Sequence, residues 1–313
     1  MAGYVGIQAQ ISRNNRMSVF YLIAFPALVL GCVYAFLYFV SGDEYRGPDV
    51  DQVNSAFLSV APIVSGIVLV WFLIAFAFHS KMIDSATGAH TLERKENMRV
   101  YNLVENLCMT EGMTMPKIHI IEDPALNAFA SGLSEKSYTV TLTRGIIDKL
   151  NDQELEGVIA HELMHIRNRD VRLLVITIIF VGIFSFVVQI LFRNMLYGGS
   201  RSSKKDNKGA IVALVIAAVA YFLALLFRFG LSRKREYMAD AGAAEMTRNP
   251  QALASALRKV SGNYEVQAVK NDDVKEMFIH NHPDKSSGFM GGLEGLFATH
   301  PPIEKRIQVL EQF

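Results

Sequence analysis

Four segments of this 313-residue chain each run for about twenty residues with almost no charged side chain. As helices, such segments are long enough to cross the roughly 30 Å hydrocarbon core of a bilayer. Burial of all four in the core of a soluble protein is the alternative, and their length argues against it. They cover residues 17–40, 57–78, 173–192 and 210–227. We therefore expect a mainly α integral membrane protein with four transmembrane helices.

The first apolar segment has the features of a permanent anchor. It follows a polar start, exceeds the length of a signal-peptide core and lacks a small-residue cleavage site. Pro26 and Pro62 lie inside the first two segments, where a membrane-spanning helix tolerates a kink. We expect residues 1–78 to form an N-terminal region with two spans, and residues 173–227 to form a second transmembrane hairpin.

The sequence His161-Glu162-Leu163-Met164-His165 lies between the second and third segments. Asn151 followed by Glu154 is a capping-box pattern, which predicts a helix start, and apolar residues recur at helical spacing after it. On such a helix His161 and His165 share one face and can bind one metal ion. Glu162 is then placed to activate a water molecule at the metal. An amphipathic helix whose histidines are only packed or solvated is the alternative.

A third metal ligand is available at Glu236, beyond the fourth segment. Catalytic zinc commonly takes three protein ligands and leaves one position open, so two histidines and this glutamate predict one Zn²⁺ per chain. Asp240, four residues later, would share a helix face with Glu236 and could accept a hydrogen bond from a ligating histidine. Taken alone, the two carboxylates would be read as a solvated face that pairs with nearby Arg or Lys.

Charges that flank the apolar segments predict the orientation in the membrane. Arg13 and Arg16 precede the first segment and the following loop is acidic, which places the N-terminus in the cytoplasm. Residues 79–172 and 228–313 then also lie in the cytoplasm, where His161, His165 and Glu236 must meet to bind one ion. If the helix with His165 continues to Leu173, the metal lies about 12 Å from the apolar segment, just outside the bilayer.

The loop of residues 194–209 fits this orientation least well. It carries Arg201, Lys204, Lys205 and Lys208, which on their own favour the cytoplasm. We expect the loop outside, because the metal ligands before and after the hairpin must share one compartment. A shallow hairpin that does not cross the bilayer completely is the alternative.

Several stretches of the chain resemble one known family. They are the four apolar segments, AHELMH, SRKREYMADAGAA after the fourth segment and ATHPPIEKRI near the end. Together they resemble the HtpX-type membrane zinc metalloproteases, gluzincins related to the CAAX prenyl protease and to mitochondrial stress proteases, over essentially the whole chain. The resemblance implies a zincin-like α+β catalytic domain with a small β-sheet. It also implies zinc bound by His161, His165 and Glu236, with Glu162 as general base.

The same resemblance implies a biological setting. The chain would clip misfolded or damaged membrane proteins on the cytoplasmic side of a bacterial inner membrane, as part of protein quality control and the stress response. We expect membrane-protein and unfolded polypeptide substrates, the lipid bilayer and other membrane quality-control proteases as partners. The net charge of +1, with no basic arm, gives no indication of nucleic-acid binding.

Residues 117–121 and 137–142 are rich in β-formers and predict two strands. Between them lies Asn127-Ala128-Phe129-Ala130-Ser131-Gly132. An exposed strand edge can hold an extended peptide through backbone hydrogen bonds. We expect Asn127, Ala128, Phe129 and Ala130 to bind substrate in this way, as the similar NAFA segment of the family implies. An ordinary hairpin without substrate contact is the alternative.

The rest of the predicted cytoplasmic part contains two further predicted helices and, toward the C-terminus, a glycine-rich stretch and three more histidines. Residues 91–111 predict a packing helix, and Asn249-Pro250 predicts another helix start. The glycines of residues 288–295 suggest a flap, and His280 and His282 read as solvated loop histidines. His300 matches a family histidine and could donate to the oxyanion of the reaction, or else cap the final helix.

These observations favour metal-assisted hydrolysis of peptide bonds, in which Glu162 takes a proton from water and passes it to the leaving amine. A non-catalytic membrane scaffold with a vestigial metal site is one rival. A prenyl-protein processing enzyme is another, and the small number of apolar segments argues against it. Cys32 lies in a span and Cys108 in the cytoplasmic part, so we expect no disulfide between them.

Overall fold

The computed structural model describes residues 7–41, 47–197, 204–229, 234–262, 266, 277–279 and 301–313. The chain forms two compact units. Unit 1 consists of Met1–Arg16, Phe78–Val175 and Phe229–Phe313, and unit 2 consists of Met17–Ala77 and Ile176–Arg228. Each unit is therefore assembled from stretches that are distant in the sequence.

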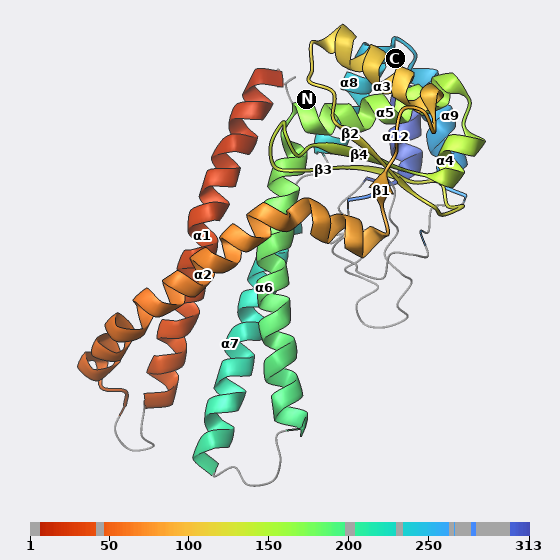
Figure 1. Ribbon diagram of the computed structural model, residues 1–313. Coiled ribbons are helices and arrows are strands. Elements are labelled where there is room, and N and C mark those ends of the chain that lie inside the picture. The colour runs from red at the N-terminus through yellow and green to blue at the C-terminus, as the bar shows by residue number, and fades with distance from the viewer. Residues whose placement is uncertain are drawn as a thin grey trace. The chain divides into compact units, whose positions relative to one another are not determined.

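Long apolar helices supply all the described secondary structure of unit 2 (Figure 1). They belong to α1 (Ile7–Ser41), α2 (Val50–Thr87), α6 (Asp170–Tyr197) and α7 (Lys204–Phe229). Pro26 and Pro62 lie inside α1 and α2 without ending them. Aromatic rings connect these helices inside the unit, since Phe25 of α1 stacks on Phe180 of α6 with ring centroids 4.3 Å apart.

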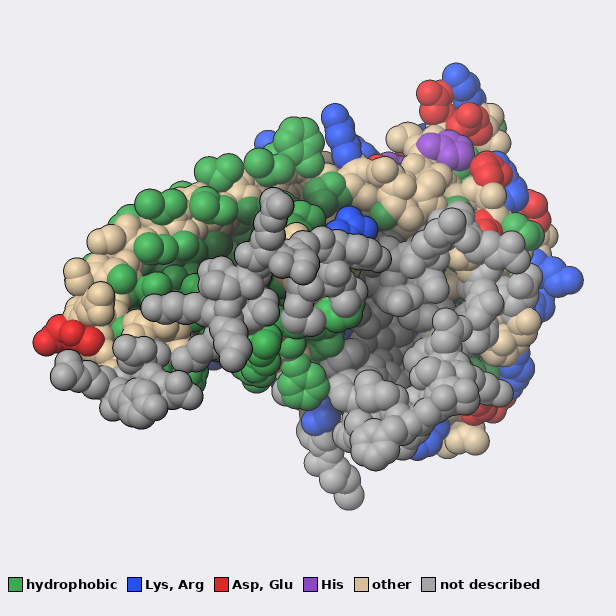
Figure 2. Space-filling view, turned by 90° about the horizontal axis from the view of Figure 1, so that it is seen from below, with side chains coloured by type: hydrophobic (Ala, Val, Ile, Leu, Met, Phe, Trp, Pro, Cys, Tyr) green, Lys and Arg blue, Asp and Glu red, His purple; other side chains and the backbone are tan. Residues whose placement is uncertain are grey.

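Three helices of the described chain are long and apolar enough to cross a membrane, namely Gln8–Ser41, Val50–Thr87 and Asp170–Asn194. Their outward faces carry large apolar side chains such as Ile63 and Ile67 of α2, each 64% exposed. Figure 2 shows such side chains gathered on the molecular surface. An apolar surface of this extent is typical of contact with lipid. The fourth predicted segment is helical too, but its apolar stretch of described residues, Gly209–Leu225, is shorter.

Unit 1 contains a mixed four-stranded sheet in the order β1-β2-β4-β3 (Figure 1). Its strands are β1 (His90–Thr91), β2 (Lys117–Ile121), β3 (Ala128–Ser131) and β4 (Thr139–Thr143). Strands β2 and β4 are parallel, whereas β1 with β2 and β3 with β4 are antiparallel. Both predicted strands are present at nearly the predicted positions, and β3 lies at one edge of the sheet.

Helix α5 (Asp152–Arg167) is the central helix of unit 1. The predicted capping box is present, because the Asn151 side chain accepts from the Glu154 N–H at 2.9 Å and Glu154 accepts from the Asn151 N–H at 3.0 Å. The helix is buried on nearly all sides by strand β3 and by α3 (Met98–Glu111), α8 (Lys234–Thr247) and α9 (Pro250–Val260). Two short helices, α4 (Arg144–Lys149) and α12 (Ile303–Leu310), complete the described elements.

Two glycines allow the neighbouring helices to approach α5 closely. A Cβ atom at Gly157 would lie 3.2 Å from Leu253 of α9, so the absence of a side chain at this position lets α9 pack closely against α5. On the other side, a Cβ atom at Gly242 of α8 would lie 2.3 Å from the Met164 side chain. The helices that carry the candidate site are thus packed at short distance and hold their side chains in fixed positions.

One predicted helix limit is wrong, and the condition set for the 12 Å estimate is not met. The helix predicted over residues 91–111 begins only at Met98, where Asn97 caps it, and Leu92 lies buried before it. Helix α5 does not continue to Leu173, because it ends at Arg167 and α6 begins at Asp170. Arg169 between them has a left-handed φ of 60°, which an α-helix does not allow. The estimate of 12 Å along one continuous helix therefore does not apply.

Candidate metal centre

His161 and His165 lie one turn apart on α5 and point to the same side. Their Nε2 atoms are 3.1 Å apart. The His161 side chain is fully buried and that of His165 is 13% exposed. The capping box and the dense packing of α5 fix the helix, so the two imidazoles converge without rearrangement.

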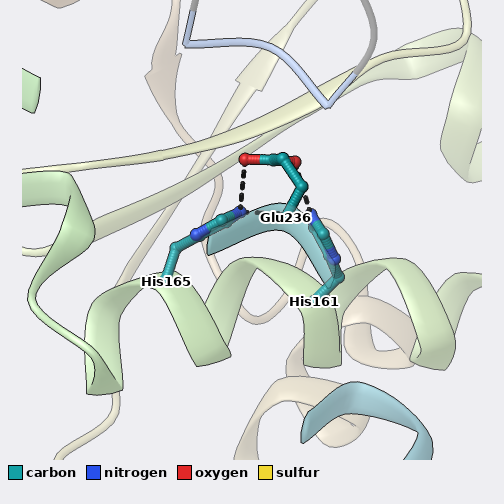
Figure 3. Close-up of side chains that lie close together, drawn as sticks. All are labelled: His161, His165 and Glu236. Atoms are coloured by element: carbon teal, nitrogen blue, oxygen red, sulfur yellow. Dashed lines mark hydrogen bonds and ion pairs between the residues drawn. The ribbon is translucent and has the colours of Figure 1, made fainter. Parts of the chain in front are cut away.

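Glu236 approaches the two histidines from the first turn of α8 (Figure 3). Its Oε2 is 3.7 Å from Nε2 of His161, and its Oε1 is 3.6 Å from Nε2 of His165. Ligand atoms of the three residues all lie within 4.8 Å of one another. Two helices that are separated by the α6–α7 hairpin in the sequence therefore bring three donor atoms together.

The donor set fits a zinc ion. Tetrahedral zinc with nitrogen and oxygen ligands about 2.0–2.1 Å away places neighbouring ligand atoms about 3.3 Å apart. The observed separations of 3.1, 3.6 and 3.7 Å lie close to this value. Two histidines and one carboxylate also form one of the ligand sets of catalytic zinc.

Carboxylates fix the orientation of both imidazoles. Nδ1 of His161 lies 2.9 Å from Oδ1 of Asp240, and Nδ1 of His165 lies 3.2 Å from Oδ2 of Asp170. A carboxylate only accepts, so each Nδ1–H donates and leaves the Nε2 lone pair for a cation. Asp240 was predicted for this position. Asp170 was not, since a residue five positions after His165 leaves the helix face unless the helix breaks, as it does at Arg169.

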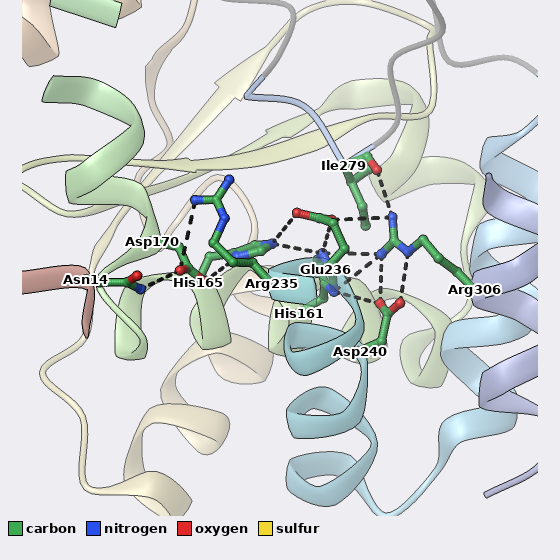
Figure 4. A network of polar contacts seen from close by, with 9 residues as sticks. All are labelled: Asn14, His161, His165, Asp170, Arg235, Glu236, Asp240, Ile279 and Arg306. Carbon is green, nitrogen blue, oxygen red and sulfur yellow. Dashed lines mark hydrogen bonds and ion pairs between the residues drawn. The ribbon is translucent and has the colours of Figure 1, made fainter. Parts of the chain in front are cut away.

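A buried arginine completes the network and was also missed by sequence reasoning. Arg306 of α12 is 1% exposed and donates from Nε and Nη2 to the two oxygens of Asp240, at 2.9 and 2.7 Å (Figure 4). Its Nη1 donates to the backbone oxygen of Ile279 at 3.1 Å. The available signal was its place in the ATHPPIEKRI stretch. On the far side, Asn14 donates to Asp170 at 2.6 Å, a contact over 156 positions that no local pattern reveals.

The charges around His161 favour a cation. Burial and the nearby Arg306 act to lower the pKa of His161, but its interactions with Asp240 and Glu236 outweigh both and raise that pKa to about 9. Burial alone would raise the pKa of Asp240, whereas the charge of Arg306 and the bond to His161 lower it to about 2. The network thus keeps a negative carboxylate behind His161 at neutral pH.

Glu162 lies next to the histidines and has different surroundings. It is 2% exposed, and its buried Oε1 has no hydrogen-bond partner among the residues that the structure describes. Burial raises its pKa, because the charged form loses hydration. A carboxylate with a raised pKa and an open acceptor is suited to take a proton from water.

Strand β3 contains Ala128, Phe129 and Ala130 of the predicted substrate segment, and Asn127 precedes it. Asn127 accepts from the Thr143 N–H at 3.0 Å, so the backbone groups of alternate residues point toward β4 and those of Ala128 and Ala130 point to the outer edge. The side chains of all four residues are buried, and at this edge the outward C=O of Ala128 accepts from the Ile279 N–H at 2.8 Å. His280, His282, His300 and the glycine-rich stretch 288–295 lie outside the described residues.

Comparisons with known proteins show which family the region with this site is similar to. The model of peptidase family M48 matches residues 94–313, which include every residue of the metal centre except Asn14. A protein of Bacteroides fragilis named as a protease HtpX homolog is 57% identical over 99% of both chains. Homologs of the same name from Dictyoglomus thermophilum and Listeria monocytogenes are 42% and 37% identical, and they cover 79% and 96% of this chain and 80% and 98% of their own.

A structural comparison gives a more distant match. The crystal structure of Ste24p from S. mikatae aligns with a TM-score of 0.48 and 17% identity, covering 95% of this chain and 66% of that one. The family match spans more than half of the chain and the relatives span nearly all of it. This chain therefore belongs to peptidase family M48 and is a membrane metalloendopeptidase of the HtpX type.

Proposed function

We propose that this chain is a zinc-dependent endopeptidase that cleaves misfolded or damaged membrane proteins at the cytoplasmic face of a bacterial inner membrane. The observation that carries the proposal is the convergence of His161, His165 and Glu236 beside the buried carboxylate of Glu162. His161, His165 and Glu236 would hold one Zn²⁺ per chain. When bound, this ion supplies Lewis acidity, which polarises a peptide carbonyl and makes a water molecule more acidic.

The protein's own groups perform the proton transfers. Glu162 accepts the proton of the attacking water at Oε1 and later delivers it to the leaving amine. Asp240 and Asp170 hold the two imidazoles through Nδ1, which leaves both Nε2 lone pairs to hold a Zn²⁺ ion when one is bound. Arg306 keeps Asp240 ionised and in place. His300 remains our proposal for a donor to the oxyanion of the substrate.

The substrate is an extended polypeptide paired with the outer edge of β3. A strand edge recognises main-chain groups, so the enzyme would accept many sequences, as quality control of unfolded chains requires. Ala130 offers its N–H and C=O at this edge, next to the helix that carries His161. Asn127, Ala128 and Phe129 position this edge.

The proposed membrane arrangement has four spans, with the three long helices joined by α7 as the fourth. Helix α7 is 26 residues long, enough to cross a bilayer as a helix. Both termini and residues 79–172 and 228–313 would lie in the cytoplasm, and the 194–209 loop would be outside. Substrates would reach the site from the bilayer or as unfolded chains, alongside other quality-control proteases.

Cleavage of casein by the purified chain in detergent tests the proposal. We expect cleavage with zinc, none after chelation, and recovery when zinc is restored. Glu162→Gln should bind zinc as the wild type does and lose activity by at least about a hundredfold, because general acid–base catalysis contributes this much or more. A zinc-loaded Glu162→Gln protein with normal activity would contradict the proposed role.

The natural substrates can be found with the same variant. Glu162→Gln should retain bound polypeptides in its own membrane, and their identification shows whether they are damaged membrane proteins. A farnesylated peptide tests the alternative of prenyl-protein processing. Preferential cleavage of that peptide over casein would replace the quality-control proposal.

A further inference from the structure

Ile279 is held through its backbone on both sides. Its N–H donates to the Ala128 oxygen at 2.8 Å, and its C=O accepts from Nη1 of Arg306 at 3.1 Å (Figure 4). Ala128 lies on the outer edge of β3, and Arg306 belongs to the network behind the metal centre. One residue of this chain thus connects the strand edge with the catalytic groups.

Apolar packing adds to these two hydrogen bonds. The ring of Phe278 meets that of Phe129 edge-on, with centroids 4.9 Å apart, and both rings are buried. Met277 and Ile279 are buried as well. The place beside β3 therefore accepts a short apolar peptide segment with an aromatic residue before an aliphatic one.

The two groups that hold Ile279 recognise main-chain atoms only. A carbonyl oxygen that accepts an N–H and a guanidinium that donates to a C=O can bind any residue except proline. Nη2 of the same guanidinium lies 3.3 Å from Nε2 of His161. A peptide residue held here therefore lies beside the metal ligands, where an endopeptidase must hold its substrate without reading its side chains.

We propose that the Ala128 oxygen and Arg306 Nη1 form a subsite for the backbone of one substrate residue, and that Ile279 fills this subsite as an internal competitor. The inference rests on the proposed function, and it adds a specific subsite and its occupant. Substrate binding then requires that Ile279 leaves, and the apparent affinity falls by the fraction of molecules in which the subsite is open.

A binding experiment on the full-length chain tests this subsite without relying on turnover. The probe is a fluorescein-labelled peptide with the sequence Glu-Met-Phe-Ile-His, and the Glu162→Gln background prevents its cleavage. Ile279→Pro removes the N–H that Ala128 accepts and should release the segment. We expect this variant to bind the probe about tenfold more tightly, since one lost hydrogen bond of about 1.4 kcal/mol changes an equilibrium by that factor.

The matched control is Ile279→Leu, which keeps the backbone N–H and nearly the same buried side-chain volume, and which should bind the probe within about threefold of the parent. Phe278→Ala loosens the segment without a backbone change and should tighten binding in the same direction as Ile279→Pro. Thermal unfolding and zinc content show whether Ile279→Pro folds. If it does not, the affinity of Phe278→Ala for the probe tests the proposal in its place. In the active background, Ile279→Pro should lower KM by a similar factor.

Equal affinities of the parent and Ile279→Pro would overturn the proposal. Weaker binding to Ile279→Pro and to Phe278→Ala would overturn it too, because residues 277–279 would then build the substrate site instead of competing for it. A failure of the proposed function looks different. In that case the wild type does not cleave casein, while the binding of the probe still reports whether Ile279 fills the subsite.

Discussion

Asp170 is the clearest example of a functional residue whose role depends on one local break in the backbone. It follows the left-handed Arg169, which turns the chain so that its carboxylate reaches His165 at 3.2 Å. Its other oxygen accepts from Asn14 at 2.6 Å. The side chain is buried, so its charge acts on His165 with little screening by water.

Replacing Asp170 by Asn should lower zinc affinity about 10- to 100-fold, the range seen when an outer partner of a metal-bound histidine is lost. The charge that makes His165 a better ligand disappears, while the side-chain size stays the same. Competition with a chelating dye measures the affinity. Asp152→Asn at the exposed start of α5, the helix that carries His165, serves as control, and an equal effect of both substitutions would contradict the role of Asp170.

At the residue scale, spacing predicts which groups share a helix face: His161 with His165 on α5, and Glu236 with Asp240 on α8. That these two faces meet was expected only because zinc needs a third ligand, and the structure brings them together. Arg306 and Asn14 reach the site over 66 and 156 positions from their carboxylate partners, Asp240 and Asp170. Nothing in their local sequence encodes these contacts, because only packing of the whole unit brings them there.

Among the elements, α5 depends on its first turn as much as on its buried face. Glu154 caps the helix and also accepts from Lys259 at 2.6 Å and from Ser255 at 2.7 Å, which connects α5 to α9. Burial alone would raise the pKa of Glu154, but these hydrogen bonds outweigh burial and lower it. The capping box thus also carries an interhelical ion pair.

The lowered pKa of Glu154 gives a pH dependence of stability with a defined sign. The ionised group stabilises the fold above its unfolded pKa of about 4.3, and this stability is lost as the pH falls through the lower folded value. Glu154→Gln should cost about 1–3 kcal/mol at pH 7 and nothing once the wild-type group is protonated. Thermal unfolding in detergent from pH 7 to 3 measures this. A constant difference between the two proteins over that range would contradict it.

Strand β3 is the second element with a testable role. Proline at Ala130 removes an outward N–H and leaves the pairing with β4 intact, because Asn127, Phe129 and Ser131 supply the inward groups. We expect kcat/KM to fall about three- to tenfold, as for the loss of one hydrogen bond, with little change in unfolding temperature. Ala130→Gly retains the N–H and should cleave nearly as the wild type does. Normal cleavage by a folded Ala130→Pro protein would remove β3 from substrate binding.

The elements themselves were largely predictable, and their limits were not. The capping box, the strand at 117–121 and the start of α9 follow from local patterns. The end of α5 was missed because Arg167 to Arg172 contain no glycine or proline, and a left-handed arginine is an exception to residue preference. The start of α3 was missed because Leu92 is buried without being helical.

At the scale of the whole molecule, one chain contains both long apolar helices and a separate unit that carries the metal centre. The three long spans follow from hydropathy and helix length. The assembly of unit 1 from three separate stretches does not, since it arises from contacts between α5, α8 and α9 across the α6–α7 hairpin.

The proposed topology predicts which sites react with a membrane-impermeant maleimide in intact cells. Ser202→Cys in the loop between α6 and α7 should react from outside, because the loop follows a third span. Met98→Cys, at a position 61% exposed in unit 1, should react only after permeabilisation. Burial raises the pKa of Cys108 to about 11, so this native thiol gives little background. Labelling of Ser202→Cys only after permeabilisation would instead favour a hairpin that does not cross the bilayer.

Zinc content measured against a chelator buffer, for the wild type and three single substitutions, tests the metal centre most directly. We predict about one zinc per chain for the wild type. His161→Ala, His165→Ala and Glu236→Ala should each weaken zinc binding more than Asp170→Asn does. Loss of a residue that only hydrogen-bonds a ligating histidine is expected to cost about 10- to 100-fold. Wild-type zinc affinity in Glu236→Ala would show that the carboxylate from α8 is no ligand, and the account of the site would then be wrong.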